Sequence, residues 1–175
     1  MNYAVIKPTD VANGPGVRVS LFVSGCTHHC KDCFNWEAWD FDYGQAFTGE
    51  TKEEILELLS PDYIEGLTLL GGEPLEPSNQ EGLLPLIEEA RRRFPQKTIW
   101  CFTGYDFEKD VLGRMFPSSE VTRKLVPLFD VLVDGRFEAD RKNLRLKFRG
   151  SENQRILDVK ASLAAEKAVW CKEFQ

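Results

Sequence analysis

The sequence has no long apolar run and no excess of positive charge. None of its 175 residues belongs to a stretch approaching the roughly 20 apolar residues that a membrane-spanning helix needs. Residues Met1 to Pro8 lack the basic start and apolar segment of a signal peptide. The net charge of −6 disfavours broad binding to nucleic acids or anionic membranes. These absences predict a cytoplasmic protein without nucleic-acid or membrane partners.

Cysteine is also scarce, and its distribution is uneven. There are five cysteines, an odd number, and three of them lie within eight residues: Cys26, Cys30 and Cys33. Such crowding makes a poor disulfide framework and is typical of a metal site. Cys101 lies within an apolar segment, so we expect it to be a buried small apolar residue. Cys171 is expected to be an incidental thiol.

The length suits one domain spanning residues 1–175. A chain of this size buries about two-thirds of its unfolded surface, so it folds without disulfide or metal staples. The apolar fraction of 42% is ordinary for a globular protein. We expect residues 160–175 to add a C-terminal helical extension, because Leu163, Ala164, Lys167 and Trp170 fall on one side of a helix there.

Hydrophobic periodicity predicts strands that alternate with helices. Strands are expected at 17–23, 67–70, 98–102 and 131–133, and helices at 51–59, 83–94 and 119–129. Residues 143–149 alternate apolar and basic side chains, which is typical of an edge strand. This order predicts an α/β fold with a mostly parallel sheet and flanking helices.

Three unusual loops each follow a predicted strand, namely 25–33, 71–74 and 103–105. The carboxyl ends of parallel strands meet at one edge of a sheet, and α/β folds place their sites there. We therefore expect these three loops to converge on a single site.

The cysteine loop has the spacing C-x3-C-x2-C and no fourth cysteine nearby. A cubane iron–sulfur cluster takes four thiolates, so three would leave one iron open. An open coordination position distinguishes a catalytic metal from a structural one. A zinc site completed by His28 or His29 is the alternative, although both histidines lie inside the ring between Cys26 and Cys30, where reach is cramped. We expect them to be exposed loop residues, or else donors to the cluster.

Two further features flank this loop. Phe34 follows the last cysteine, and it either packs in the core or provides a flat wall for an adenine. Gly71 and Gly72 end a strand, where the lack of a Cβ lets a backbone approach a ligand closely.

The cysteine pattern with its following aromatic residue, and the Gly71-Gly72-Glu73-Pro74 segment, resemble the radical S-adenosylmethionine superfamily. Within it, the chain is similar to the family of activating proteins of anaerobic ribonucleoside-triphosphate reductases, which are glycyl-radical enzyme activases. The resemblance runs from Met1 to Val159. It includes the segments 13–16, 21–26, 70–75, 100–105, 130–135 and 149–155.

The resemblance implies cofactors and residues that hold them. The ligands of a [4Fe–4S] cluster, which also make the catalytic group, would be Cys26, Cys30 and Cys33. The fourth iron would bind the amino and carboxylate groups of S-adenosylmethionine. Asp32, Cys33 and Phe34 would flank the adenine. Gly72, with Gly71 and Glu73, would hold the methionine end.

The implied activity is that of an oxidoreductase. An electron from a low-potential donor such as flavodoxin would cleave S-adenosylmethionine to methionine and a 5′-deoxyadenosyl radical. That radical would then form a glycyl radical on the large subunit of the reductase. The implied fold is a compact partial (βα) barrel, since 175 residues are too few for eight strand–helix units.

Two alternatives remain open. The first is another radical S-adenosylmethionine enzyme of the pyruvate formate-lyase activase or deazapurine carboxylate synthase type, which would share only the cysteine and glycine motifs. The second is a non-enzymatic zinc module that binds a protein partner.

Overall fold

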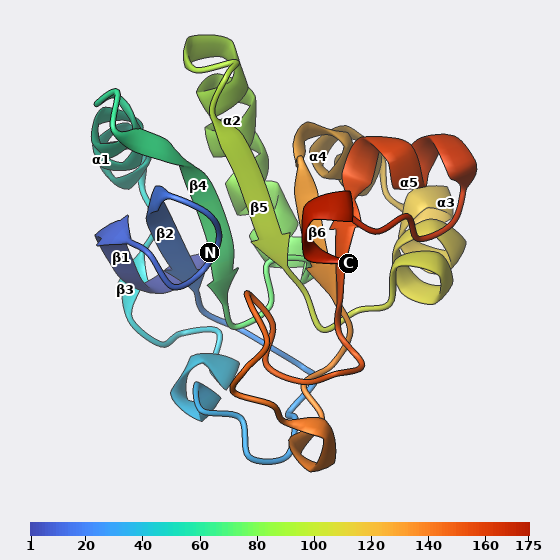
Figure 1. Cartoon of the computed structure of the whole chain (residues 1–175). Coiled ribbons are helices and arrows are strands. Elements are labelled where there is room, and N and C mark those ends of the chain that lie inside the picture. The colour runs from blue at the N-terminus through green and yellow to red at the C-terminus, as the bar shows by residue number, and fades with distance from the viewer.

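The computed structural model describes residues 1–175 and contains one seven-stranded sheet (Figure 1). The spatial order is β3-β1-β2-β4-β5-β6-β7. The strands are β1 (Asn2–Asp10), β2 (Val17–Val23), β3 (Gln45–Ala46), β4 (Ile64–Gly71), β5 (Thr98–Phe102), β6 (Val131–Asp134) and β7 (Arg155–Asp158). β2, β4, β5 and β6 are parallel neighbours, whereas β1, β3 and β7 join antiparallel. The α/β class is confirmed, but the sheet is mixed rather than mostly parallel.

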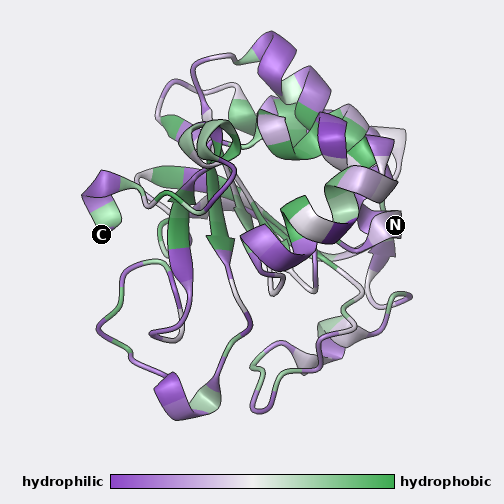
Figure 2. Cartoon of the chain, turned by 90° about the vertical axis from the view of Figure 1, so that its right-hand side faces the viewer, coloured by the Kyte–Doolittle hydropathy of each residue, from purple (hydrophilic) through white to green (hydrophobic).

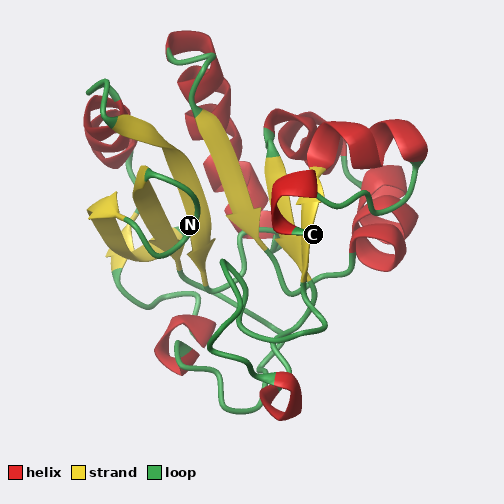
Figure 3. Cartoon of the chain, viewed as in Figure 1, coloured by secondary structure: helices red, strands yellow, loops and turns green.

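Helices connect the parallel strands, and one more helix follows β7 (Figure 3). They are α1 (Gly49–Leu59), α2 (Pro77–Arg93), α3 (Phe116–Ser118), α4 (Glu120–Leu125) and α5 (Val159–Ala165), with a π-helical segment at Phe107–Met115. At the start of α1 the Thr48 hydroxyl accepts from the Thr51 amide, and the Thr51 hydroxyl accepts from the Thr48 amide. These two hydrogen bonds form a capping box. None of the helices combines the length and the apolarity that crossing a membrane requires.

The two faces of the sheet are covered differently. The helices pack on one face, where Val19, Leu21 and Val23 of β2 join the main apolar core. On the other face, Trp100 and Ile156 belong to a small second cluster, against which only the short 3-10 helix Lys172–Phe174 of the C-terminal segment packs. Figure 2 shows the helices gathered on one side of the sheet and the C-terminus on the other. The second face is therefore the side on which a ligand has room.

The C-terminal segment corrects the prediction of a helix through residues 160–175. The helix α5 ends at Ala165, and Glu166 takes a left-handed conformation with φ of 53°. The chain then turns back along β7, where the Cys171 amide donates to the Ile156 carbonyl at 2.9 Å. Leu163 and Ala164 lie in α5, whereas Trp170 lies in the returning stretch and bridges to Leu157, so these residues do not share one helical face. Their periodicity was therefore misleading.

The predicted edge strand at 143–149 is also wrong. The chain between β6 and β7 is irregular there, and the strand that pairs with β6 is β7. The alternating apolar residues point to different environments: Leu144 is 88% exposed, whereas Phe148 is half-buried against Trp100. A period of two arises here without a partner strand, because one side of the loop faces a cavity.

Candidate functional site

The three unusual loops converge at the carboxyl ends of the parallel strands, as predicted. The Gly72 amide donates to the Val23 carbonyl at 2.7 Å, and the Glu73 amide donates to the Gly25 carbonyl at 2.7 Å. The Gly104 amide donates to the Glu73 carboxylate, also at 2.7 Å. Backbone and side-chain bonds thus join the cysteine loop, the glycine loop and the loop after β5.

A cavity of about 560 Å³ opens where these loops meet. Its floor is apolar and comes from the strand ends at Phe22, Leu70, Phe102 and Val133. One wall is the cysteine loop and the other is the long loop between β6 and β7, and both lie below the sheet in Figure 1. The second wall was not predicted as part of the site. Its lining residues include Phe137, Lys142, Asn143, Leu144, Leu146 and Phe148.

All three clustered cysteines are free and line this cavity. Cys26 is buried, and Cys30 and Cys33 are half-buried. Burial raises the pKa of the Cys26 thiol to about 11. Burial is also the main cause that raises the pKa of Cys30. A metal or cluster that binds here must therefore displace thiol protons.

The cysteine loop is wrapped by two left-handed residues. His29 has φ of 49° and Asp32 has φ of 59°, a conformation that His and Asp tolerate better than most residues. The Cys33 amide donates to the Cys30 carbonyl at 3.2 Å, which closes a tight turn between the two cysteines. The reversals curl the loop so that all three thiols face one cavity.

The two histidines of the cysteine loop differ in exposure and in their contacts. His29 is exposed, as expected, and its ring stacks on Trp39 at 4.3 Å between centroids. The expectation is wrong for His28, whose side chain is only 4% exposed and whose Nε2 lies 2.9 Å from the Glu73 carboxylate. Neither histidine lines the cavity. Neither is therefore placed to complete a zinc site with the thiols.

Phe34 and Asp32 both line the cavity beside Cys33. Phe34 is 89% exposed, so the reading of this ring as a core residue is wrong. The structure leaves its face available at the cavity mouth, where it suits the predicted role of an adenine wall.

The paired glycines serve the protein's own backbone as well as the cavity. A Cβ on Gly72 would lie 2.6 Å from the Gly25 carbonyl oxygen, and Gly71 has φ of +111°. Both residues line the cavity, but Glu73 does not, and it is only 1% exposed. The structure thus brings five of the six predicted cofactor-binding residues to the cavity and places the Glu73 carboxylate behind it.

The model of a family described as "4Fe-4S single cluster domain" matches residues 12–157. The anaerobic ribonucleoside-triphosphate reductase-activating protein of Enterobacteria phage T4 is 45% identical over 89% of this chain and 93% of its own length. Proteins of the same name from Haemophilus influenzae and Escherichia coli K12 are 42% and 40% identical, over 89% and 88% of this chain and 97% and 96% of their own.

The chain belongs to this activating-protein family. The identity extends across nearly the whole chain, so it goes well beyond the cysteine and glycine motifs that other radical S-adenosylmethionine enzymes would share. The matching family model describes a single 4Fe-4S cluster, which favours an iron–sulfur cofactor over the zinc module.

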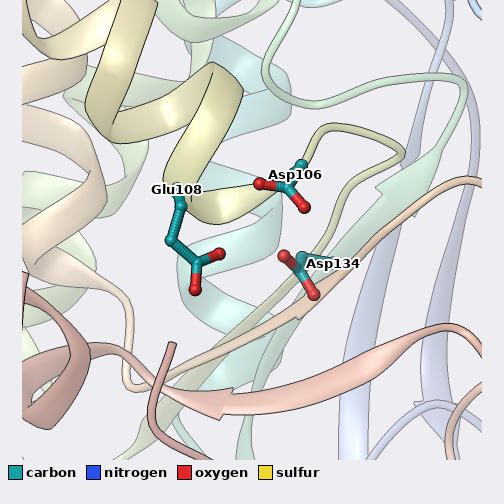
Figure 4. Close-up of side chains that lie close together, drawn as sticks. All are labelled: Asp106, Glu108 and Asp134. Atoms are coloured by element: carbon teal, nitrogen blue, oxygen red, sulfur yellow. The ribbon is translucent and has the colours of Figure 1, made fainter. Parts of the chain in front are cut away.

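A second group of side chains in this family member resembles a metal site. Asp106, Glu108 and Asp134 bring their carboxylates within 4.8 Å of one another, and Figure 4 shows them pointing together. The Arg155 guanidinium already lies among them, at 2.6 Å from Asp134, 2.8 Å from Glu108 and 3.6 Å from Asp106. Burial raises the pKa of Asp134 despite this arginine. The group is an ion-pair network that joins β6, β7 and the π-helical segment.

Proposed function

We propose that Cys26, Cys30 and Cys33 hold a [4Fe–4S] cluster with which this protein cleaves S-adenosylmethionine, and that it forms a glycyl radical on an anaerobic ribonucleoside-triphosphate reductase. The observation that carries the proposal is the common cavity lined by three free thiols and the paired glycines. Cys101 is fully buried and Cys171 lies outside the cavity, so no fourth cysteine competes for the open position.

The spacing of the thiols suits a cluster better than one zinc ion. A tetrahedral zinc ion with zinc–sulfur bonds of about 2.3 Å holds its sulfurs roughly 3.8 Å apart. The only three metal-ligating side chains whose ligand atoms all lie within 4.8 Å of one another are the three carboxylates beside Arg155. The three cysteines and the two histidines beside them do not form such a group, which supports a cluster over a zinc ion closed by a histidine.

The cavity also suits a nucleotide beside such a cluster. Its volume of about 560 Å³ falls within the range of roughly 300–1,000 Å³ typical of small-molecule sites. We assign Phe34 and Asp32 to the adenine side and Gly71 and Gly72 to the methionine end. These assignments agree with the positions of the four residues on the cavity wall.

The residues of this cavity bind, orient and exclude water. When bound, the reduced cluster would supply the electron that breaks a carbon–sulfur bond of S-adenosylmethionine, which yields methionine and a 5′-deoxyadenosyl radical. The apolar floor at Phe22, Leu70 and Phe102 keeps water from the reacting carbon. Such a radical takes hydrogen from the nearest C–H bond, so the position of the target glycine decides specificity.

We further propose that the sheet acts as an incomplete barrel which admits the target. Its edge strands β3 and β7 are not paired with each other, so the sheet does not close. The α-helices pack on one face, and the cavity lies at the end of the other face. A loop of a large protein substrate has access from that open side.

The test is anaerobic reconstitution with iron and sulfide, followed by incubation with reductant, S-adenosylmethionine and the reductase. We expect a brown protein, release of 5′-deoxyadenosine without the reductase, and a glycyl doublet in electron paramagnetic resonance with it. A colourless zinc protein that releases no 5′-deoxyadenosine would overturn the proposal. Release of 5′-deoxyadenosine without a glycyl doublet would keep the chemistry and reject the target.

A further inference from the structure

The buried Glu73 carboxylate occupies the point where the three site loops meet. One of its oxygens accepts from the Leu75 amide at 2.9 Å and from the Thr103 hydroxyl at 2.7 Å. The other accepts from the Gly104 amide at 2.7 Å and lies 2.9 Å from His28 Nε2. These partners belong to the glycine loop, the loop after β5 and the cysteine loop. One carboxylate thus joins all three.

These contacts leave the carboxylate no capacity for a ligand. An ionised carboxylate offers about four acceptor sites, and four donors already occupy those of Glu73. The residue is 1% exposed and is not part of the cavity wall. An amino group bound in the cavity would have to displace a buried partner to reach it, which costs the free energy of an unsatisfied buried polar group.

His28 is the side chain through which the cysteine loop reaches this carboxylate. Its ring lies against Tyr105 at 4.4 Å between centroids, with the planes at 67°. A Cβ on Gly104 would come within 2.6 Å of the same ring, so the loop after β5 closes tightly over it. Because His28 lies between Cys26 and Cys30, the contacts of its ring tie the segment that carries both thiols to Glu73 and Tyr105.

A second bond pair supports the same arrangement. The Thr27 amide and hydroxyl donate to the Glu76 carboxylate at 2.9 and 2.6 Å, and Glu76 is 5% exposed. Both adjacent residues of the cysteine loop are therefore anchored to acidic side chains that follow β4. Both anchoring acids are buried, and neither lines the cavity.

We propose that Glu73 is a positioning residue that acts through His28, fixing the cysteine loop against the glycine loop and thereby setting where S-adenosylmethionine lies relative to the cluster. This inference rests on the proposed function and deepens it. It replaces the expectation that the Glu73 side chain touches the methionine end. Partners that orient metal ligands typically contribute about 10- to 100-fold in affinity or activity, which sets the expected size of the effect.

The affinity for S-adenosylmethionine tests the proposal in reconstituted protein. Glu73→Gln and His28→Leu should each weaken binding about tenfold or more, because glutamine keeps only one of the two acceptor oxygens and His28→Leu removes the imidazole partner. His28→Gln, whose amide can still donate to Glu73, should remain near the wild-type affinity. His29→Asn is the matched control, because that histidine is exposed and does not contact Glu73, and because asparagine tolerates the left-handed backbone at this position.

The double variant of Glu73→Gln and His28→Leu should bind no more weakly than Glu73→Gln alone, because His28 acts only through the Glu73 contacts that Glu73→Gln already disrupts. Additive losses would overturn the proposal. Loss of affinity in Glu73→Gln with wild-type affinity in His28→Leu would also overturn it, because Glu73 would then act without His28. Unchanged affinity in Glu73→Gln would show that Glu73 plays no part in binding S-adenosylmethionine.

A second readout needs neither cluster nor S-adenosylmethionine. In cluster-free protein, Glu73→Gln and His28→Leu should speed amide hydrogen exchange in residues 25–33 and 103–105 together, with α1 and α2 unchanged. Loss of protection throughout α1 and α2 would make the pair a general stability element and overturn the proposal. If the wild type fails to bind S-adenosylmethionine, the proposed function fails, while this measurement still decides whether the loops are joined.

Discussion

At the scale of residues, the three clustered cysteines share a cavity but not an environment. Cys26 follows β2 directly and is buried, whereas Cys30 and Cys33 lie farther along the loop and are half-buried. Their spacing in the sequence was enough to predict a metal or cluster site, because three thiols within eight residues suit metal binding better than disulfides. The placement of His28 was not predictable, since its partner Glu73 is 45 residues away.

Replacing Cys30 with Ala should abolish cluster binding and S-adenosylmethionine cleavage while leaving the fold largely intact. The residue lies in a loop at the cavity wall, so its loss creates no core cavity. Iron content and circular dichroism measure the two effects. Cys171→Ala is the matched control and should keep its iron, because that thiol lies outside the cavity. Full cleavage activity in Cys30→Ala would end the assignment.

The cluster-free thiol of Cys26 should react slowly with iodoacetamide at neutral pH. Its pKa is raised to about 11 by burial, so the reactive thiolate is scarce there. The rate should rise about tenfold per pH unit between roughly pH 7 and 10 and level off above the pKa. Mass spectrometry of the modified peptide follows this rate. A plateau reached below pH 9 would contradict the stated environment of Cys26.

At the scale of elements, the sequence predicted best where the apolar period was clean. The bounds of β2 and β5 were predicted without error. The strand β1 was missed because irregularities between Tyr3 and Val5 and between Lys7 and Asp10 break its alternation. The segments 143–149 and 160–175 were misassigned because the first lines a cavity and the second turns back along β7 after α5 ends.

Arg155 joins β7 to β6 and to the π-helical segment through its ion pairs. Arg155→Met should therefore lower the free energy of unfolding by about 3 kcal/mol. The substitution leaves Asp134, Glu108 and Asp106 close together without their shared cation. Urea denaturation measures the loss. Arg92→Met is the control and should leave stability unchanged, because Arg92 pairs with Glu89 on the exposed surface of α2. Equal stability of both variants would show that the network contributes nothing.

At the scale of the whole molecule, the sheet separates the main apolar core from the cavity. Helices stabilise one face, while the cavity and the loop between β6 and β7 occupy the end of the other. That loop carries a run of basic residues in a chain whose net charge is −6: Arg136, Arg141, Lys142, Arg145, Lys147 and Arg149. The convergence of the site loops was predictable from strand order, but this second wall was not, because irregular loops have no period.

Leu144 lies on the second wall at the cavity mouth and is 88% exposed. Leu144→Asp should lower the glycyl-radical yield on the reductase about tenfold, because an apolar contact at a mouth is replaced by a charge. Release of 5′-deoxyadenosine without the reductase should stay near the wild-type level. Tyr63→Asp is the control, since Tyr63 is 65% exposed and precedes β4 at the opposite end of the strand. Equal radical yields in both variants would remove Leu144 from the contact.

The central claim is that one iron of the cysteine-bound cluster lacks a protein ligand and is free to bind S-adenosylmethionine. Mössbauer spectroscopy of protein reconstituted with isotopically enriched iron, with and without S-adenosylmethionine, tests it directly. We predict that a single iron site changes its spectrum on addition of S-adenosylmethionine while the others keep theirs. A spectrum in which no iron site responds, with every iron held by a protein side chain, would contradict the account.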